Sequence, residues 1–93
     1  MKVTPQNLPF HNLIGLEVEV LEHPTESLRG VKGRVIFETK NTLLIETPEG
    51  KRIKVLKIGY FKFKLPDGRE VVVEGWKIKG RPEERLKRFL KAR

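Results

Sequence analysis

The sequence contains no cysteine, which excludes disulfide bonds and thiolate metal sites. Its two histidines, His11 and His23, are too few to form a zinc site by themselves. Apolar runs are only a few residues long, and the N-terminus lacks a basic segment followed by an apolar stretch. These absences predict a cytoplasmic protein without a membrane span or a secretion signal.

Residues suited to catalysis are also scarce. Acyl or phosphoryl transfer needs a nucleophile, a base and a charge-stabilising group held together. The single serine, Ser27, and the single aspartate, Asp67, both lie in segments that resemble turns. Glu83 and Glu84 are adjacent, so on a helix they point about 100° apart and do not converge on a metal ion. We therefore expect a binding protein with no cofactor and no catalytic residue of its own.

Basic charge is abundant and unevenly distributed. The 93 residues are 38% apolar, enough for one small domain, and carry a net charge of +8. Residues 1–50 have a net charge of −2, whereas residues 51–93 have one of +10. This asymmetry favours a polyanionic partner, with a merely soluble basic surface as the alternative. Eleven glutamates against one glutamine are typical of a thermophile.

Alternating apolar and polar residues predict strands joined by short turns rich in proline and glycine. We place six strands at about 16–22, 32–39, 42–47, 51–57, 60–65 and 69–78. Most aromatic residues fall at alternating core positions. An antiparallel meander of this size has raw edges if it is flat, which favours an all-β fold in which residues 16–79 close into a small SH3-like barrel.

The two ends of the chain have other patterns. Residues 1–15 predict an N-terminal extension with a short helical segment, packed on the barrel or on a partner. Residues 80–93 predict a basic amphipathic helix, with Pro82 in its first turn and acidic residues at its positive end. Leu86, Phe89 and Leu90 share one face of that helix.

A basic strand face is the predicted RNA contact. Lys62 and Lys64 point outward if the phenylalanines that alternate with them fill the core. The stripe continues through Lys54, Lys57, Arg69, Lys77, Lys79 and Arg81 towards Arg85 and Arg88. Tyr60 and Trp76 are the only aromatic candidates for base stacking, and an edge or core position is the preferred interpretation of both. We expect binding to depend on phosphates and shape more than on base identity.

Five segments stand out by their order and spacing. They read NLIGLEVEV at 12–20, GVKGRV at 30–35, ETKNTL at 38–43, LPDG at 65–68 and GRPEERLK at 80–87. Together they resemble the Sm-like barrel subunit of archaeal ribonuclease P, called protein component 1, over about residues 7–88. The most specific feature of the resemblance is the pairing of ETxNTL with a terminal RPExR.

The resemblance implies a function that composition does not. The chain would be a subunit of a ribonucleoprotein endonuclease, a hydrolase whose catalytic RNA, with bound Mg²⁺, removes 5′ leaders from precursor tRNA. Its partners would be ribonuclease P RNA, a zinc-ribbon subunit and other ribonuclease P proteins, with precursor tRNA met indirectly. The implied protein-docking residues are Leu8, Phe10, Leu13, Leu86, Phe89 and Leu90. The implied RNA-facing residues are Arg34, Lys40, Lys54, Lys57 and the basic residues of 77–88.

Other functions share parts of this pattern. A ribosomal or translation-type barrel that binds ribosomal RNA has the same composition and differs only in its motifs. An SH3-like interaction module would bind acidic peptides or anionic lipid with its basic tail, but an aromatic-lined groove is missing from the pattern. A free-standing nuclease is disfavoured because the sequence has no carboxylate cluster for metal ions.

Overall fold

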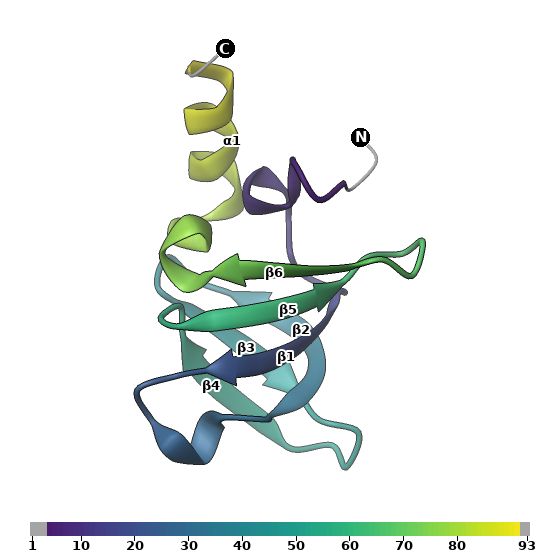
Figure 1. Cartoon of the computed structure of the whole chain (residues 1–93). Coiled ribbons are helices and arrows are strands. Elements are labelled where there is room, and N and C mark those ends of the chain that lie inside the picture. Colours follow the sequence, from purple (N-terminus) through teal and green to yellow (C-terminus); the bar gives the residue numbers. More distant parts are fainter. Residues whose placement is uncertain (1–3, 92–93) are drawn as a thin grey trace.

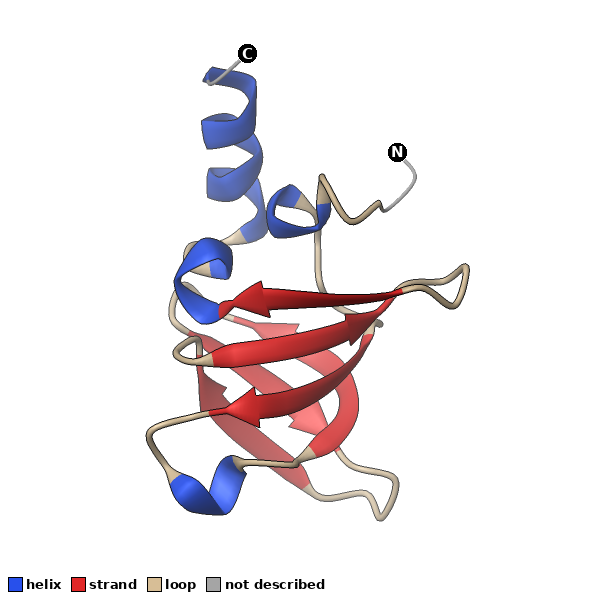
Figure 2. Ribbon diagram, viewed as in Figure 1, coloured by secondary structure: helices blue, strands red, loops and turns tan. Residues whose placement is uncertain are grey.

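The alternating segments fold into strands close to where their patterns begin and end. The computed structural model describes residues 4–91, without the side chains of Phe89 and Lys91. The strands are β1 (Glu17–Glu22), β2 (Lys32–Glu38), β3 (Thr42–Glu46), β4 (Arg52–Leu56), β5 (Tyr60–Lys64) and β6 (Glu70–Glu74). Three 3-10 helices, η1 (Leu8–Phe10), η2 (Glu26–Leu28) and η3 (Gly75–Ile78), and the helix α1 (Pro82–Lys91) complete the described chain. The predicted mainly-β fold with a C-terminal helix is confirmed (Figure 2).

The strands form one antiparallel sheet in the order β4-β3-β2-β1-β5-β6. The predicted meander is wrong at one connection, because β5 pairs with β1 instead of with β4. A twisted sheet curls, so the chain that leaves β4 arrives beside β1, as Figure 1 shows. Gly59 makes this approach possible: it has a φ of +90°, and a Cβ there would collide with the carbonyl group of Glu22.

The chain segments that follow the two edge strands are closely packed at one end of the sheet. β4 and β6 are the ends of the hydrogen-bonded order within residues 4–91. Just beyond them, Gly75 lies so close to Lys57 that an added Cβ would be 2.5 Å from the Lys57 carbonyl carbon. Its amide donates to the carbonyl of Gly59 at 2.8 Å. The last strand ends at Glu74. Residues 75–78, which we predicted as strand, form η3 instead.

The core follows the predicted alternation up to a bulge in β2. Val18, Val20, Phe61 and Phe63 are buried, as expected for inward positions. In β2 the register with β3 shifts between Val35 and Phe37. This extra residue reverses the alternation, so Phe37 is 55% exposed and Glu38 is buried. The expectation that aromatic residues lie mostly in the core also fails for Tyr60 and Trp76, which are exposed.

The terminal elements lie together at one end of the sheet. Figure 1 shows α1 projecting beyond β6, with η1 beside its first turns. Leu8 of η1 and Leu13 are fully buried and belong to the main core. No helix within the described residues has the length and apolar character needed to cross a membrane.

Candidate nucleic-acid interface

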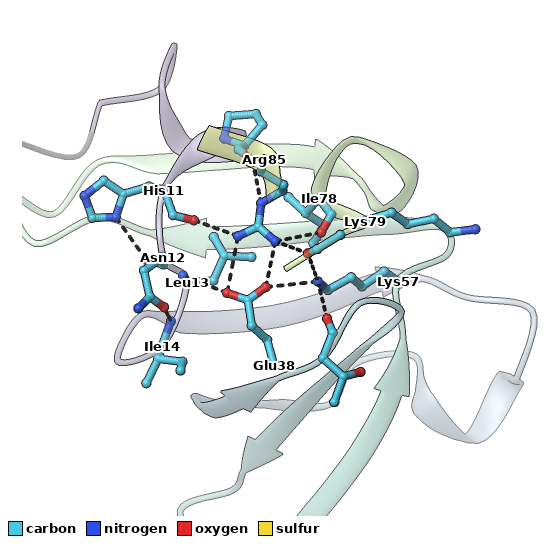
Figure 3. A network of polar contacts seen from close by, with 12 residues as sticks. His11, Asn12, Leu13, Ile14, Glu38, Lys57, Ile78, Lys79 and Arg85 are labelled. Atoms are coloured by element: carbon cyan, nitrogen blue, oxygen red, sulfur yellow. Dashed lines mark hydrogen bonds and ion pairs between the residues drawn. The ribbon is translucent and has the colours of Figure 1, made fainter. Parts of the chain in front are cut away.

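Three ionised side chains are buried where α1 meets the sheet. The Lys57 ammonium donates to Oε1 of Glu38 at 2.9 Å, and the Arg85 guanidinium donates to both Glu38 oxygens, at 2.8 and 3.2 Å. Figure 3 shows Lys57 and Arg85 converging on this carboxylate. The three side chains have relative exposures of 0%, 0% and 1%. We call them the buried triad; it holds two cations against one anion.

The triad connects segments that are far apart in the sequence. Arg85 donates to the carbonyls of Pro9 and His11, both at 2.7 Å, and of Ile78 at 3.1 Å. The second Glu38 oxygen accepts the amide of Leu13 at 3.1 Å. Within the described residues, no buried side-chain polar atom lacks a hydrogen-bond partner. Arg85 therefore links α1 to the N-terminal segment and to β2.

The two sequence motifs that carry the family resemblance meet in this triad. Glu38 opens the ETKNTL segment, and Arg85 closes the RPEER segment. Burial alone raises the pKa of Glu38, but hydrogen bonds and charges from Arg85 and Lys57 outweigh it, so the pKa lies below its ordinary value. Burial lowers the pKa of Lys57, and the Glu38 carboxylate offsets only part of this effect.

The predicted RNA contacts at Lys57 and Arg85 are wrong in this structure. Both side chains are enclosed and saturated with hydrogen bonds, so neither reaches a phosphate outside. Sequence reasoning missed Glu38 altogether, since a glutamate after Phe37 in an alternating strand is expected to point outward. The joint occurrence of ETxNTL and RPExR was the available signal for Glu38. It did not indicate that Glu38, at the start of the first motif, contacts Arg85, at the end of the second.

The predicted basic strand face is instead a ladder of alternating charge. In β1, the carboxylate oxygens of Glu17 lie 3.6 Å from the Arg34 guanidinium and 4.0 Å from the Lys64 ammonium. Glu19 lies 4.0 Å from Lys32 and 3.3 Å from Lys62. Lys62 also contacts Glu70 at 3.6 Å, and its hydrogen bond with Glu19 raises its pKa.

This charge ladder follows directly from strand register. Glu17 is paired with Arg34 of β2 and Lys64 of β5, and Glu19 with Lys32 and Lys62, so these two carboxylates each lie between two cations. Arg69 is similarly engaged by Asp67 at 2.8 Å. Arg34, Lys62, Lys64 and Arg69 therefore each have a carboxylate neighbour, and a phosphate must compete with it to bind them.

Exposed cations without a carboxylate partner gather at the other end of the sheet, around the base of α1. We call them the basic cluster: Lys40, Lys77, Lys79, Arg81 and Arg88 are exposed, and within residues 4–91 none has a carboxylate at ion-pair distance.

Backbone contacts hold the segments of the basic cluster together. The Gly80 amide donates to the Lys40 carbonyl at 2.7 Å, and Arg88 donates to the Lys79 carbonyl at 2.5 Å. Figure 3 shows the Lys79 side chain extending away from the buried triad. Lys54 is also exposed and unpaired, but it lies on the edge strand β4.

The predicted protein-docking residues divide between core and surface. Leu8 and Leu13 are fully buried, so they stabilise the chain internally and offer no surface to a partner. Phe10 is half-buried. On α1, Leu86 and Leu90 are 40% and 55% exposed. The side chain of Phe89 lies outside the described part of the structure.

The fold and the site together define a small, basic, all-β protein in which the buried triad links α1 to the sheet. Among residues 4–91, no three His, Asp or Glu side chains are grouped to hold a metal ion. Residues 6–88 match the family model of ribonuclease P/MRP, subunit p29. The chain belongs to this family, which confirms the resemblance found in the sequence.

Named relatives are similar in sequence to this chain over nearly its full length. Ribonuclease P protein component 1 of Desulfurococcus amylolyticus is 50% identical over 94% of this chain and 96% of its own. The same component of Staphylothermus marinus is 48% identical over 98% of this chain and all of its own. The solved structure of Mth11, a homologue of human RNase P protein Rpp29, is 43% identical and superimposes with a TM-score of 0.60, covering 80% of this chain and 96% of that one.

Proposed function

We propose that this chain is the p29-type protein subunit of ribonuclease P and supports its RNA in removing 5′ leaders from precursor tRNA. The observation that carries the proposal is the family match across residues 6–88, with relatives near 50% identity that are named as ribonuclease P protein component 1. The ribonuclease P holoenzyme is an endoribonuclease of tRNA maturation. The role of this chain is to bind RNA, and Mg²⁺ belongs to the RNA of the holoenzyme.

The basic cluster is the proposed phosphate-binding surface. A lysine or arginine that neutralises a phosphate releases condensed counterions, which drives binding. Cations of the charge ladder gain less from a phosphate, because they must first give up Glu17 or Glu19. The cluster cations have no such competitor, so the favourable free energy of binding is largest there.

The exposed apolar face of α1 is the proposed docking surface for another ribonuclease P protein, for which a zinc-ribbon subunit is our candidate. Leu86 and Leu90 supply apolar area that the chain itself leaves open. Leu86→Glu adds a charge to this surface without touching the core, so it should abolish pairing on gel filtration while the circular dichroism spectrum stays unchanged. Pairing that survives would exclude this face.

Reconstitution tests the proposal. The chain is combined with ribonuclease P RNA and the other protein subunits, and cleavage of precursor tRNA is measured with and without it. We expect the complete mixture to process the 5′ leader faster than the mixture that lacks this chain, and the chain alone with Mg²⁺ to be inactive. Equal rates in the two mixtures, or selective recovery of ribosomal RNA in a pull-down, would favour a translation-type RNA-binding protein instead.

A further inference from the structure

Trp76 is the most exposed large apolar side chain in the described structure. It is the only tryptophan of the chain and has a relative exposure of 62%. It lies in η3, the turn that leads from β6 towards α1. Exposed tryptophan is unusual because its large ring is stabilised by burial, and most of the surface of Trp76 is open to solvent in the described structure.

Two neighbours contact the indole ring. Its Nε1–H donates to Oε2 of Glu74. The Lys77 ammonium lies 5.5 Å from the ring centroid, in a cation–π contact. One face of the ring is therefore next to a positive charge, and the Glu74 carboxylate is turned towards the indole edge.

The ring is also next to the basic cluster. Lys77, Lys79 and Arg81 follow it within five residues, all exposed and without a carboxylate partner among the described side chains. Lys40 joins them through the Gly80 amide. Proteins that bind single-stranded nucleic acid combine an exposed aromatic ring with nearby cations. Bases stack on the ring, and phosphates contact the cations.

We propose that Trp76 stacks on an unpaired base of the bound RNA, on the ring face opposite Lys77, while the basic cluster holds the flanking phosphates. This inference rests on the proposed function and adds to it a contact with a base. Stacking tolerates every base because each has a π surface. The site therefore selects an unpaired nucleotide, in a loop, bulge or end, and not a particular sequence.

Affinity measurements with single-residue variants test the stacking. Ribonuclease P RNA and a short single-stranded RNA are titrated against the wild type, Trp76→Phe and Trp76→Leu. Loss of the ring in Trp76→Leu should weaken binding roughly 5- to 150-fold, the range that one stacked base supplies, with the salt dependence unchanged. Trp76→Phe should retain most of the affinity. Equal loss in both variants would overturn the inference, because it would point to the Glu74 hydrogen bond instead.

Fluorescence gives an independent readout because Trp76 is the only tryptophan. Binding of the single-stranded RNA should quench its emission, whereas an abasic oligomer of the same length, with the same phosphates, should not. Phe37→Leu, which removes an exposed ring outside the basic cluster, is the matched control and should bind normally. Wild-type binding of RNA without quenching would reject Trp76 stacking but leave the proposed function standing. Absence of any RNA binding by the wild type would reject both.

Discussion

Removing the anion of the buried triad should be far more damaging than removing one of its cations. In Glu38→Gln, Lys57 and Arg85 remain enclosed and face each other without a carboxylate. Breaking a buried ion pair from one side costs about 3–5 kcal/mol. A chain of this size typically has a total stability of about 5–15 kcal/mol, so this single change removes a large share of it.

Lys57→Met provides the comparison. It leaves Glu38 with Arg85, a one-to-one pair that keeps both hydrogen bonds, at 2.8 and 3.2 Å. The Thr39 carbonyl loses its donor, which costs about 1–3 kcal/mol, and this cost is partly offset because the excess buried charge is gone. We expect a net loss of at most about 2 kcal/mol.

Urea unfolding followed by circular dichroism measures the difference. With a slope of about 1–3 kcal/mol per molar urea, Glu38→Gln should lower the midpoint by at least about 1 M, and clearly more than Lys57→Met. Adding Lys57→Met to Glu38→Gln should restore stability, because it removes one of two facing cations. A double variant less stable than Glu38→Gln alone would refute the electrostatic reasoning and indicate a steric role.

Acid provides a second readout of the same triad. The pKa of Glu38 lies below 4.5, its ordinary value, so between the two pKa values the unfolded chain binds more protons than the folded one. The stabilisation by Glu38 is therefore complete above about pH 4.5 and is lost as the pH falls through the folded-state pKa. The midpoint gap between the wild type and Glu38→Gln should shrink in acid. A gap that is constant down to about pH 3 would contradict this.

Two further predictions concern the packing of Gly75 against Lys57 and the proposed RNA-binding surface. Gly75→Ala forces a Cβ against the Lys57 backbone and should cost about 1–3 kcal/mol; an unchanged urea midpoint would show that the backbone at Gly75 and Lys57 moves apart freely. Changing Lys79 and Arg81 to Ala together should reduce the slope of log affinity against log salt by about 1.4–1.8. The matched change of Lys62 and Lys64 should reduce that slope much less, because carboxylates compete with a phosphate for both lysines. Filter binding at several salt concentrations measures both slopes, and the opposite order would contradict this assignment.

The local pattern of the sequence was sufficient for the elements and for the family. Alternation placed all six strands within a few residues of their observed bounds, because side chains on a strand point to opposite faces in turn. Pro82 and the acidic first turn marked the start of α1. The order and spacing of short motifs identified the family, and the family match over residues 6–88 confirmed it.

Tertiary structure decided which charges are available to a partner. A one-residue bulge in β2 turned Glu38 inward and Phe37 outward, and strand periodicity has no signal for where such a bulge occurs. The buried Glu38 carboxylate binds Lys57 and Arg85, which lie 19 and 47 residues away in the sequence. Two of the predicted RNA contacts are therefore buried residues. The pairing of β1 with β5 placed carboxylates beside Lys62 and Lys64. A charge counts in the sequence wherever it stands, but its ability to bind a phosphate depends on burial and on neighbours that only the fold brings into contact.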